Sequence, residues 1–378
     1  MKVLQIVGYT DGGIGAHVKT LVKDLRHIGE NVLVLAPENV INNFGFQNCI
    51  DISPNIACSI KGMKKFINTA KILRKCISDS DIVHVHGNQM AFFSLLFCKK
   101  RDRRKIIVTL HNKIILSGYK QFLSVFLRKY VARNAEVVSA VSSDLLEEAR
   151  ADGAKHTFIA PIFAPKVECL LKEKRLSFQN RHSNFLKLIN DLPEDKRKFF
   201  DINKPLVLSV CRIAAQKSIE NVVRIANSGI DANFVVVGSG VKSLLERLKA
   251  EDVNKKVYFA GKSNDIPTWL NAANIMLLTS KWEGCPLVLQ EAMANGLPIV
   301  STFVGGIGDL VYDDENDLKA GMLSEVDDWQ NMASHVQLLL NDETLWNKFS
   351  KDAKQIAKML LTNSEIAVFW QKNYLELV

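Results

Sequence analysis

Two glutamates, Glu283 and Glu291, stand eight positions apart in the stretch SKWEGCPLVLQEAMANGLPIV. Between them, Pro286 is typical of a helix start, and an Asn-Gly pair at the far end is typical of a helix stop. The pattern therefore predicts a short helix over Leu287–Ala294. Glu283 would lie in the loop before that helix, and Glu291 about one and a half turns inside it.

The start of this predicted helix has the chemistry of an anion site. The first backbone N–H groups of a helix have no partner within the helix, and the dipole places positive charge there. A carboxylate on each side could accept hydrogen bonds from sugar hydroxyls while the amides bind phosphate. We therefore expect a sugar phosphate to contact the residues of the helix start, namely Gly284, Cys285, Pro286 and Leu287.

Two cations follow a predicted strand over Leu206–Val210, in the sequence CRIAAQKS. Arg212 offers a planar fork that binds phosphate through two hydrogen bonds, and Lys217 offers a point charge. A position just past a strand is where parallel sheets bind ligands. We interpret Arg212 and Lys217 as residues that bind a diphosphate. The alternative is that they are ordinary surface charges.

Composition limits the class of protein. The chain has 378 residues and 47% apolar content, enough for two or three full cores. Its seven cysteines form no CxxC pair, which favours a reducing cytoplasm over a disulfide scaffold. No apolar run reaches the 18 residues of a typical membrane span.

Charge is unevenly distributed along the chain. The net charge is +9, and residues 61–133 hold 17 basic but only 3 acidic side chains. This asymmetry indicates an anionic partner for the first half of the chain.

The chain begins with a predicted strand over residues 3–7, followed by the sequence GYTDGGIG and an amphipathic helix. A strand, a glycine loop and a helix start together form phosphate-loop geometry, because glycine lets the backbone approach a ligand. Gly12, Gly13 and Gly15 are the candidate contacts. A tight structural turn is the alternative, and the dinucleotide-binding spacing G-x-G-x-x-G is absent.

Two histidines end predicted strands. His86 closes the strand over Asp81–His86, and His111 follows the strand over Ile106–Leu110. Because ligands of open parallel sheets bind beyond the carboxyl ends of the strands, both imidazoles should lie on the same rim as the glycine loop. We interpret both as candidate ligand contacts, with a structural histidine as the alternative.

Two predicted helices, over residues 61–77 and 119–133, are basic and amphipathic. With the basic cluster Lys99–Lys105 they favour contact with an anionic membrane surface. Core helices with their charged sides in water are the alternative.

The stretch around the two glutamates resembles the signature of the retaining family 4 glycosyltransferases, S-x-x-E-G-x-P-L-V-x-x-E-A-M-A-x-G-x-P-I-V. Arg212 and Lys217 are similar to that family's G-R-x-x-x-x-K-G loop, although Cys211 and Ser218 stand where glycines are usual. Two further loops resemble the family, and they contain Gly238 and Lys262; the second is where the family holds the nucleotide base. Where the family commonly has G-G-x-P-E, this chain has Gly308-Asp309, which leaves the role of Asp309 open.

The resemblance implies an α/β protein with the GT-B fold, in which two Rossmann-like domains face each other across a cleft. It divides the chain into an N-terminal acceptor-binding domain over 1–165, a linker over 166–204, a C-terminal nucleotide-sugar-binding domain over 205–360 and a terminal helix over 361–378 that returns to the first domain.

The resemblance also implies roles for individual residues. Arg212 and Lys217 would neutralise the leaving diphosphate, Glu291 would accept from the ribose hydroxyls, and Glu283 would hold the donor sugar. His111 would contact the sugar near its reactive face, with Glu283, Arg212 and Lys217 as its catalytic partners. The donor would also contact Gly13 and Gly15, and the acceptor would contact Gly12 and His86.

These features predict a retaining, metal-independent glycosyltransferase that needs no cofactor and moves a sugar from a UDP-sugar to a saccharide acceptor. The basic first half favours a lipid-linked acceptor at the inner face of the cytoplasmic membrane, as in bacterial polysaccharide or O-antigen assembly. We expect no metal site, because the triplet Asp79-Ser80-Asp81 precedes its strand and should lie at the opposite edge of the sheet.

Three other classes fit less well. A non-catalytic basic nucleotide-binding or nucleic-acid-binding protein would explain the charge but not the two glutamates at a phosphate-binding helix start. We therefore expect no nucleic-acid partner. A nicotinamide-dependent oxidoreductase would need the missing dinucleotide fingerprint. A sugar phosphorylase would need a lysine for a pyridoxal cofactor, and no lysine in the sequence stands out for that role.

Overall fold

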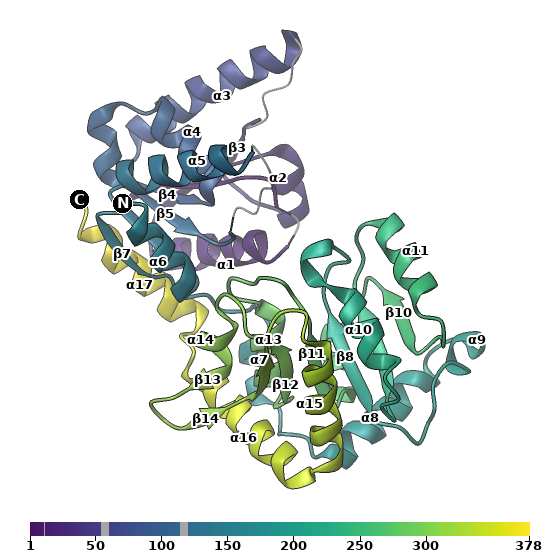
Figure 1. The fold of residues 1–378 in the computed structure, drawn as a ribbon. Coiled ribbons are helices and arrows are strands. Elements are labelled where there is room, and N and C mark those ends of the chain that lie inside the picture. Colours follow the sequence, from purple (N-terminus) through teal and green to yellow (C-terminus); the bar gives the residue numbers. More distant parts are fainter. Residues whose placement is uncertain (11, 54–59, 114–119) are drawn as a thin grey trace. The chain divides into compact units, whose positions relative to one another are not determined.

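The computed structural model describes residues 1–10, 12–53, 60–113 and 120–378. These residues form two compact units, one of Met1–Pro165 with Leu361–Val378 and one of Lys166–Leu360 (Figure 1). Residue 119, where we expect the second basic helix to begin, and Asp11 of the glycine loop lie outside the described residues.

The first unit is built on a parallel sheet of seven strands in the order β3-β2-β1-β4-β5-β6-β7. The strands are β1 (Lys2–Val7), β2 (Asn31–Ala36), β3 (Cys49–Asp51), β4 (Ile82–His86), β5 (Ile106–Leu110), β6 (Val137–Ala140) and β7 (His156–Ile159). The central strands are buried on both faces and mostly apolar, as parallel sheets covered by helices require. The short edge strands β3 and β7 have no strong apolar run, and the sequence does not predict them.

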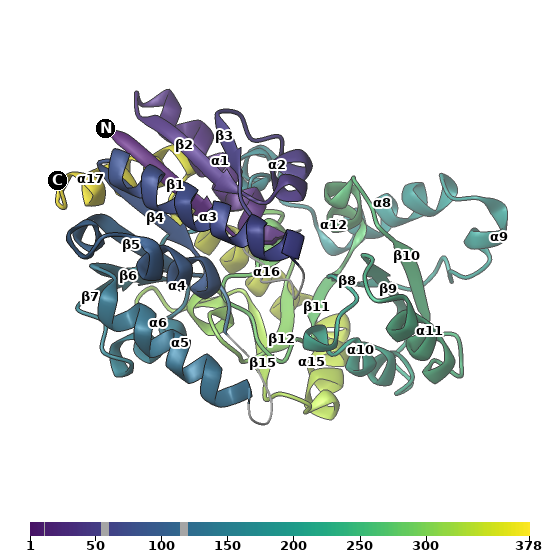
Figure 2. The same cartoon turned by 90° about the horizontal axis from the view of Figure 1, so that it is seen from above.

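Helices cover this sheet on both sides. They are α1 (Gly13–His27), α2 (Glu38–Phe44), α3 (Ile60–Asp79), α4 (Asn88–Phe97), α5 (Lys120–Asn134), α6 (Ser143–Ala151) and α17 (Asn363–Leu375), with a 3-10 turn η1 (Lys100–Lys105). Val18, Leu21, Val22 and Leu25 form the buried side of α1, which packs against α17. On another part of the unit α3, α4 and α5 lie side by side (Figures 1 and 2).

The second unit repeats the architecture with a parallel sheet of six strands in the order β10-β9-β8-β11-β12-β15. The strands are β8 (Leu206–Val210), β9 (Asn233–Val237), β10 (Val257–Gly261), β11 (Ile275–Leu278), β12 (Ile299–Thr302) and β15 (Gly321–Ser324). A two-stranded antiparallel hairpin, β13 (Tyr312–Asp313) with β14 (Leu318–Lys319), stands beside it. Two parallel sheets, each flanked by helices, confirm the predicted α/β organisation.

Helices and one 3-10 turn complete the second unit. They are α7 (Val167–Lys172), α8 (Phe178–Asn190), α9 (Glu194–Arg197), η2 (Ala215–Lys217), α10 (Ile219–Ala226), α11 (Lys242–Glu251), α12 (Ile266–Ala272), α13 (Leu287–Ala294), α14 (Ile307–Val311), α15 (Trp329–Asn341) and α16 (Glu343–Met359). The apolar faces of α10, α11 and α15 pack on the sheet in one core with β8, β9 and β11. None of the described helices in either unit has the length and apolar character that crossing a bilayer requires.

Residues 166–204, which we expect to be a linker, are integrated into the second unit. They contain α7, α8 and α9, with α7 packed against α13 and α16, and α8 against α12. The sequence contains a signal for α8 that the high charge of the region obscures, because Phe185, Leu188 and Ile189 recur at helical spacing and are buried. This segment is therefore part of the core that supports α13.

Arg181 of α8 shows how that support works. Its side chain is fully buried, and its guanidinium donates to four oxygens: the carbonyls of Leu270 and Ala273 at 2.8 and 3.1 Å, and the side-chain and main-chain oxygens of Asn295 at 2.8 and 2.7 Å. These carbonyls lie at the C-terminal ends of α12 and α13, where the helix dipoles favour a cation. Burial lowers the pKa of Arg181 to about 9, so it remains charged at neutral pH.

We expect Arg181→Met to destabilise the second unit strongly. The substitution orphans buried acceptors, each worth about 1–3 kcal/mol, so the loss should be at least about 3 kcal/mol. For a unit of this size that corresponds to a fall in Tm of about 6–12 °C, measured by calorimetry. Arg247→Met is the matched control, because Arg247 is an exposed partner of Glu251 in α11. Equal Tm values for the two variants would contradict the role of Arg181.

Candidate functional site

The carboxyl edge of the second sheet brings several predicted loops together. The loop after β8 runs beside the loop after β9, because the N–H groups of Cys211 and Ile213 donate to the carbonyls of Val237 and Ser239, each at 3.0 Å. The β9 loop in turn reaches the end of β10, since the N–H of Gly238 donates to the carbonyl of Gly261 at 2.8 Å. The strand ends therefore form one continuous rim.

Gly238, predicted to contact the donor, has a structural reason to be glycine. Its φ is +149°, and a Cβ at this position would stand 1.8 Å from the carbonyl oxygen of Cys211. Any side chain would push the β8 and β9 loops apart.

Lys217 and Glu283 meet where the strand order reverses, between β8 and β11. Such a reversal leaves a crevice at the carboxyl edge of an open sheet, the usual ligand position. The Lys217 ammonium donates to Glu283 Oε1, and the Ser280 hydroxyl donates to the same oxygen at 2.5 Å. Both side chains of the ion pair are largely buried. The two residues lie 66 positions apart in the sequence, and the fold brings their side chains into direct contact.

Backbone contacts fix this ion pair from both sides. The Thr279 hydroxyl donates to the carbonyls of Lys217 and Ser218 at 3.0 and 2.9 Å. On the other side, the Gly306 N–H donates to the carbonyl of Glu283 at 3.1 Å. Gly305, with φ of +53°, passes so close that a Cβ would stand 1.7 Å from that carbonyl oxygen. Gly305 must therefore be glycine for this loop to pack beside Glu283.

The helix after the ion pair begins and ends as predicted. Pro286 is the N-cap of α13, Leu287–Ala294 are helical, and Gly296 has φ of +70°. Burial raises the pKa of Cys285, just before the helix, to about 12, and has the same effect on Cys211. Both side chains are therefore neutral thiols, and the positive character beside them comes from Lys217 and the helix start.

Glu291 lies partly buried in α13, and burial raises the pKa of its carboxyl, an effect that Lys166 opposes. Arg212 and Lys262 occupy the same rim with exposed side chains. Gly284 is buried before the helix, and Asp309 of α14 acts electrostatically on Cys285, which places Asp309 near the start of α13.

The glycine loop of the first unit forms a helix start. Gly12 is the N-cap of α1, Gly13 is its first residue, and both are exposed. Gly15 is instead buried, and a Cβ there would lie 2.2 Å from the ring of Phe44. The first two glycines are therefore open to a ligand, whereas Gly15 serves packing.

His86 and His111 lie in contact at the carboxyl ends of β4 and β5. His86 Nδ1 and His111 Nε2 are 3.0 Å apart, and His86 Nε2 is 2.7 Å from Gln5 Oε1. Burial lowers the pKa of His111 to about 3 and that of His86 well below its ordinary value. Both imidazoles are therefore neutral at physiological pH.

Sequence reasoning missed three members of this cluster: His17, His84 and Tyr374. His17, two residues inside α1 beyond Gly15, has its ring 5.9 Å from that of His111. His84 binds Thr109 and Tyr374, a residue of α17. One signal was present: polar residues at alternate positions of apolar strands, as in the sequence IVHVH of β4.

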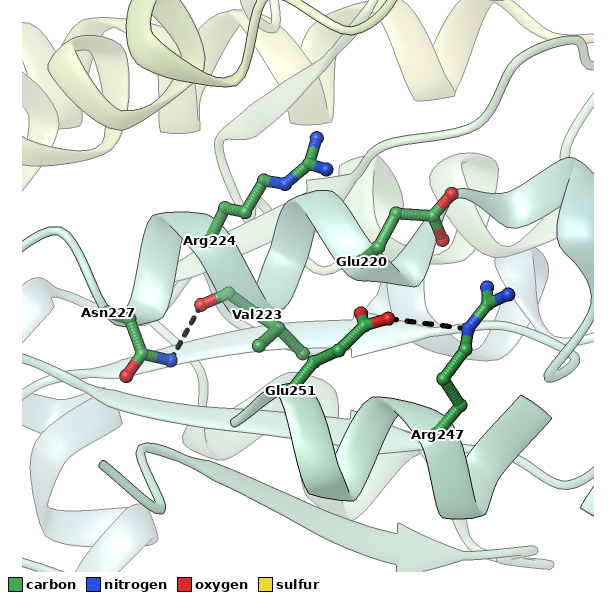
Figure 3. Close-up of a pocket in the computed structure, with 6 residues that line it drawn as sticks. All are labelled: Glu220, Val223, Arg224, Asn227, Arg247 and Glu251. Carbon is green, nitrogen blue, oxygen red and sulfur yellow. Dashed lines mark hydrogen bonds and ion pairs between the residues drawn. The ribbon is translucent and has the colours of Figure 1, made fainter. Parts of the chain in front are cut away.

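A hollow elsewhere in the second unit contains none of the predicted site residues. It lies between α10 and α11 and is lined by Glu220, Val223, Arg224, Asn227, Arg247 and Glu251 (Figure 3). Its two arginines and two glutamates balance in charge, and Arg247 pairs with Glu251 at 3.4 Å. It offers no net charge to a phosphate. Across the described residues of both units, no group of three or more His, Cys, Asp or Glu side chains is arranged to hold a metal ion.

Two family models match the chain. Residues 11–162 match the model described as Glycosyltransferase Family 4, and residues 191–356 match the model described as Glycosyl transferases group 1. The first match lies within the first unit, and the second includes both Lys217 and the stretch from Glu283 to Glu291.

Relatives among characterised proteins extend the likeness. The chain is 26% identical over 284 residues to the N-acetyl-alpha-D-glucosaminyl L-malate synthase of Bacillus anthracis, covering 73% of this chain and 69% of that protein. It is 28% identical over 314 residues to the UDP-Gal:alpha-D-GlcNAc-diphosphoundecaprenol alpha-1,3-galactosyltransferase of Escherichia coli, covering 78% and 74%.

Solved structures share the fold. A sucrose-phosphate synthase from Thermosynechococcus elongatus matches with a TM-score of 0.76 at 18% identity, covering 100% of this chain and 99% of that one. The Anabaena protein Alr3699/HepE in complex with UDP matches with a TM-score of 0.76 at 17% identity, covering all of both chains.

Proposed function

The chain belongs to the family 4 glycosyltransferases and has their GT-B fold, and from this premise we propose that it transfers a sugar from a UDP-sugar to a saccharide acceptor with retention of configuration. The observation on which this depends is the Lys217–Glu283 pair at the start of α13, where a cation and helix amides can bind a diphosphate beside a carboxylate that can bind hydroxyls. The names of two similar proteins support the nucleotide: the Escherichia coli relative acts on UDP-Gal, and the Anabaena structure holds UDP.

In this proposal the second unit binds the donor. Lys217, Arg212 and the amides at the start of α13 neutralise the diphosphate, and Glu291 accepts from the ribose hydroxyls. Lys262 lies beside the end of β10, where the base would bind, and Glu283 holds hydroxyls of the sugar. The partly buried Glu291 suits a ligand with hydroxyl donors, since a hydroxyl hydrogen bond would compensate the burial of its carboxylate.

The chemical step breaks the bond between the sugar's anomeric carbon and the diphosphate oxygen and forms a bond from that carbon to the acceptor oxygen. The acceptor attacks the face from which the diphosphate departs, and its proton passes to a departing phosphate oxygen. Fixed cations and amides stabilise the negative charge as it develops on the diphosphate. No metal ion is required in this scheme, because protein cations perform the neutralisation.

The first unit supplies contacts to saccharide hydroxyls. His111 lies at the end of β5 as a neutral imidazole, with His86 behind it, and Gly12 and Gly13 present a helix start on the same edge of that unit. Neutral imidazoles and backbone amides form hydrogen bonds with hydroxyl groups, and the ligand needs no charge for this.

A panel of nucleotide sugars tests the proposal. At about 100 times its dissociation constant a bound donor should stabilise the protein by about 2.7 kcal/mol, which is about 5–11 °C in Tm. We expect UDP-sugars to produce this shift and ADP-sugars and GDP-sugars to produce little. A panel in which no nucleoside diphosphate sugar stabilises the protein would contradict the proposed activity.

We expect Glu291→Ala to weaken UDP binding about 10-fold or more, because a hydrogen bond to a charged group is worth about 1.5–3 kcal/mol. Titration calorimetry with UDP measures the change. Glu246→Ala, at an exposed position of α11, is the matched control. Unchanged affinity in Glu291→Ala would remove this residue from the ribose site.

For the acceptor, we propose a lipid-linked saccharide at the cytoplasmic face of a membrane. Phe122, Leu123 and Phe126 of α5 are 83%, 56% and 58% exposed, which is unusual for large apolar side chains. Exposed cations occur on η1, which contacts α5, and on α3, which is separated from α5 by α4. They are Lys64, Lys65, Lys71, Arg74, Lys75, Lys100, Arg101 and Arg104. Arg128 of α5 does not contribute, because it pairs with Glu148 and Asp152. The name of the Escherichia coli relative, which acts on a diphosphoundecaprenol-linked sugar, supports the same acceptor class.

We expect the protein to sediment with anionic vesicles at low salt and less at high salt, because screening weakens surface attraction. The double variant Phe122→Ser/Phe126→Ser should bind at least about 10-fold more weakly, since each buried phenyl ring contributes about 1.5–3 kcal/mol. Val253→Ser, at an exposed apolar position of the second unit, is the control. Absence of sedimentation at low salt would contradict membrane binding.

A further inference from the structure

A stripe of polar side chains crosses one face of the first sheet. Gln5 pairs in register with His84, and Thr109 pairs with both His86 and Ser139. Residues in register on parallel strands share a face, and alternate residues of one strand do too. All five are almost fully buried. Helix α17 covers this face, with the ring of Trp370 4.2 Å from that of His84.

The stripe is one continuous chain of hydrogen bonds. Starting from β6, Ser139 Oγ is 3.3 Å from the carbonyl of Val108 and 2.8 Å from Thr109 Oγ1, which is 2.6 Å from His84 Nε2. From His84 Nδ1 the chain continues 2.7 Å to the Tyr374 hydroxyl and 3.1 Å to Gln5 Nε2. It then passes from Gln5 Oε1 through His86 to His111, over 2.7 and 3.0 Å.

The end of the chain at Val108 determines its direction. A carbonyl can only accept, so the Ser139 hydroxyl donates to it and must accept from Thr109. Thr109 has then used its one hydrogen, so His84 Nε2 donates to it. Neutral His84 is bare at Nδ1 and accepts from Tyr374. The reversed chain would lose the bond to Val108.

The donors and acceptors between Tyr374 and His111, at the carboxyl edge of the sheet, can be assigned in the same way. Having donated its hydrogen, the Tyr374 hydroxyl accepts from the amide nitrogen of Gln5. The Gln5 oxygen therefore accepts from His86 Nε2, and the bare Nδ1 of His86 accepts from Nε2 of His111. Burial keeps the pKa of each of the three histidines far below its ordinary value, so each imidazole carries one proton.

We propose that Tyr374 and Gln5 are positioning residues that hold His111 as its Nε2–H tautomer, so that its Nδ1 lone pair accepts a hydrogen bond from a saccharide hydroxyl. Among the described residues, none pairs with Nδ1 of His111. A bare nitrogen binds a hydroxyl and repels a phosphate oxygen. The identity of the ligand as a saccharide rests on the proposed function. The tautomer of His111 does not, because it follows from the hydrogen-bond chain alone.

The tautomer can be measured without substrate. In full-length protein labelled with ¹⁵N-histidine, long-range ¹H–¹⁵N correlations distinguish a protonated ring nitrogen from a bare one, and His111→Asn identifies the His111 signals. We expect His111 to be Nε2–H with bare Nδ1 between about pH 6 and 8, without titrating. An Nδ1–H tautomer or an imidazolium would overturn the proposal, whatever the outcome of the donor panel.

Two variants of α17 separate positioning from packing. Tyr374→Phe removes the group that orients the Gln5 amide, so the part of the chain from Gln5 through His86 to His111 can reverse, and the Nδ1–H form of His111 should appear. We expect kcat to fall about 10-fold, the effect of one hydrogen bond, with unchanged UDP affinity. Ile366→Val removes a buried methyl group from the same helix and should lower stability by about 1 kcal/mol with no change of tautomer or kcat. The proposed positioning role of Tyr374 is wrong if Tyr374→Phe retains the wild-type tautomer of His111, or if both variants lower kcat equally.

Discussion

Replacing Lys217 by methionine should lower turnover by about 10²–10³-fold, the scale of losing one preorganised donor to a developing anion. Lys217 ends the η2 turn between β8 and α10, and its ammonium pairs with Glu283 in the loop before α13, so its charge is fixed in place before substrate arrives. Measurement of kcat with a saturating donor isolates the chemical step from binding.

The single substitution also leaves Glu283 buried without its cation, which could reduce activity by repelling the diphosphate. The double variant Lys217→Met/Glu283→Gln removes both charges and should remain about as inactive as the single variant. Lys249→Met, at an exposed position of α11, is the control. Near wild-type turnover in the single variant would remove Lys217 from the mechanism, and recovery in the double variant would assign the defect to the unpaired carboxylate.

The elements that position the candidate site of the second unit could be predicted from the sequence, because each of them is a short local stretch. The positions of Arg212, Lys217 and Glu283 follow from strands β8 and β11, which are mostly apolar runs with clear ends. Once two parallel strands are adjacent, residues after their carboxyl ends must share an edge. Only the direct contact between Lys217 and Glu283 needed the structure.

The histidine cluster of the first unit could be predicted only in part. His86 and His111 follow from strand ends, but Tyr374 reaches His84 from 290 residues away. No local pattern specifies which face of the sheet a terminal helix covers. Arg181 is a similar case: a charged residue in a charged segment gave no sign of burial, because its partners are main-chain oxygens contributed by α12 and α13.

We expect acid to unfold the first unit well before the second. Four histidines, His17, His84, His86 and His111, are buried and neutral, and burial lowers the pKa of His17 to about 4 and that of His111 to about 3. Their unfolded forms take up protons below the ordinary value near 6.5, while the folded forms do not, so stability falls as the pH drops from about 6.5 towards 4 and is unaffected above that range. At about pH 5.5 each histidine contributes a loss of roughly 1.4 kcal/mol, or about 6 kcal/mol for the four together.

The tryptophans allow the two units to be followed separately. Of the five, only Trp370 belongs to the first unit, so ¹⁹F NMR of protein containing 5-fluorotryptophan reports each unit, with Trp370→Phe as the assignment variant. Between about pH 7 and 5.5 the Tm of the first unit, measured from the Trp370 signal, should fall by about 10–20 °C. The second unit should shift less, because burial that lowers a histidine pKa there is only partial, at His335, whereas four buried imidazoles lie in the first unit. His17→Gln removes one of the four titrating groups, so the number of protons that the first unit takes up on unfolding should fall by about one. A Trp370 midpoint that does not change over this range would mean that the imidazoles are already protonated in the fold, and the hydrogen-bond chain that ends at His111 could not then have the direction deduced from neutral rings.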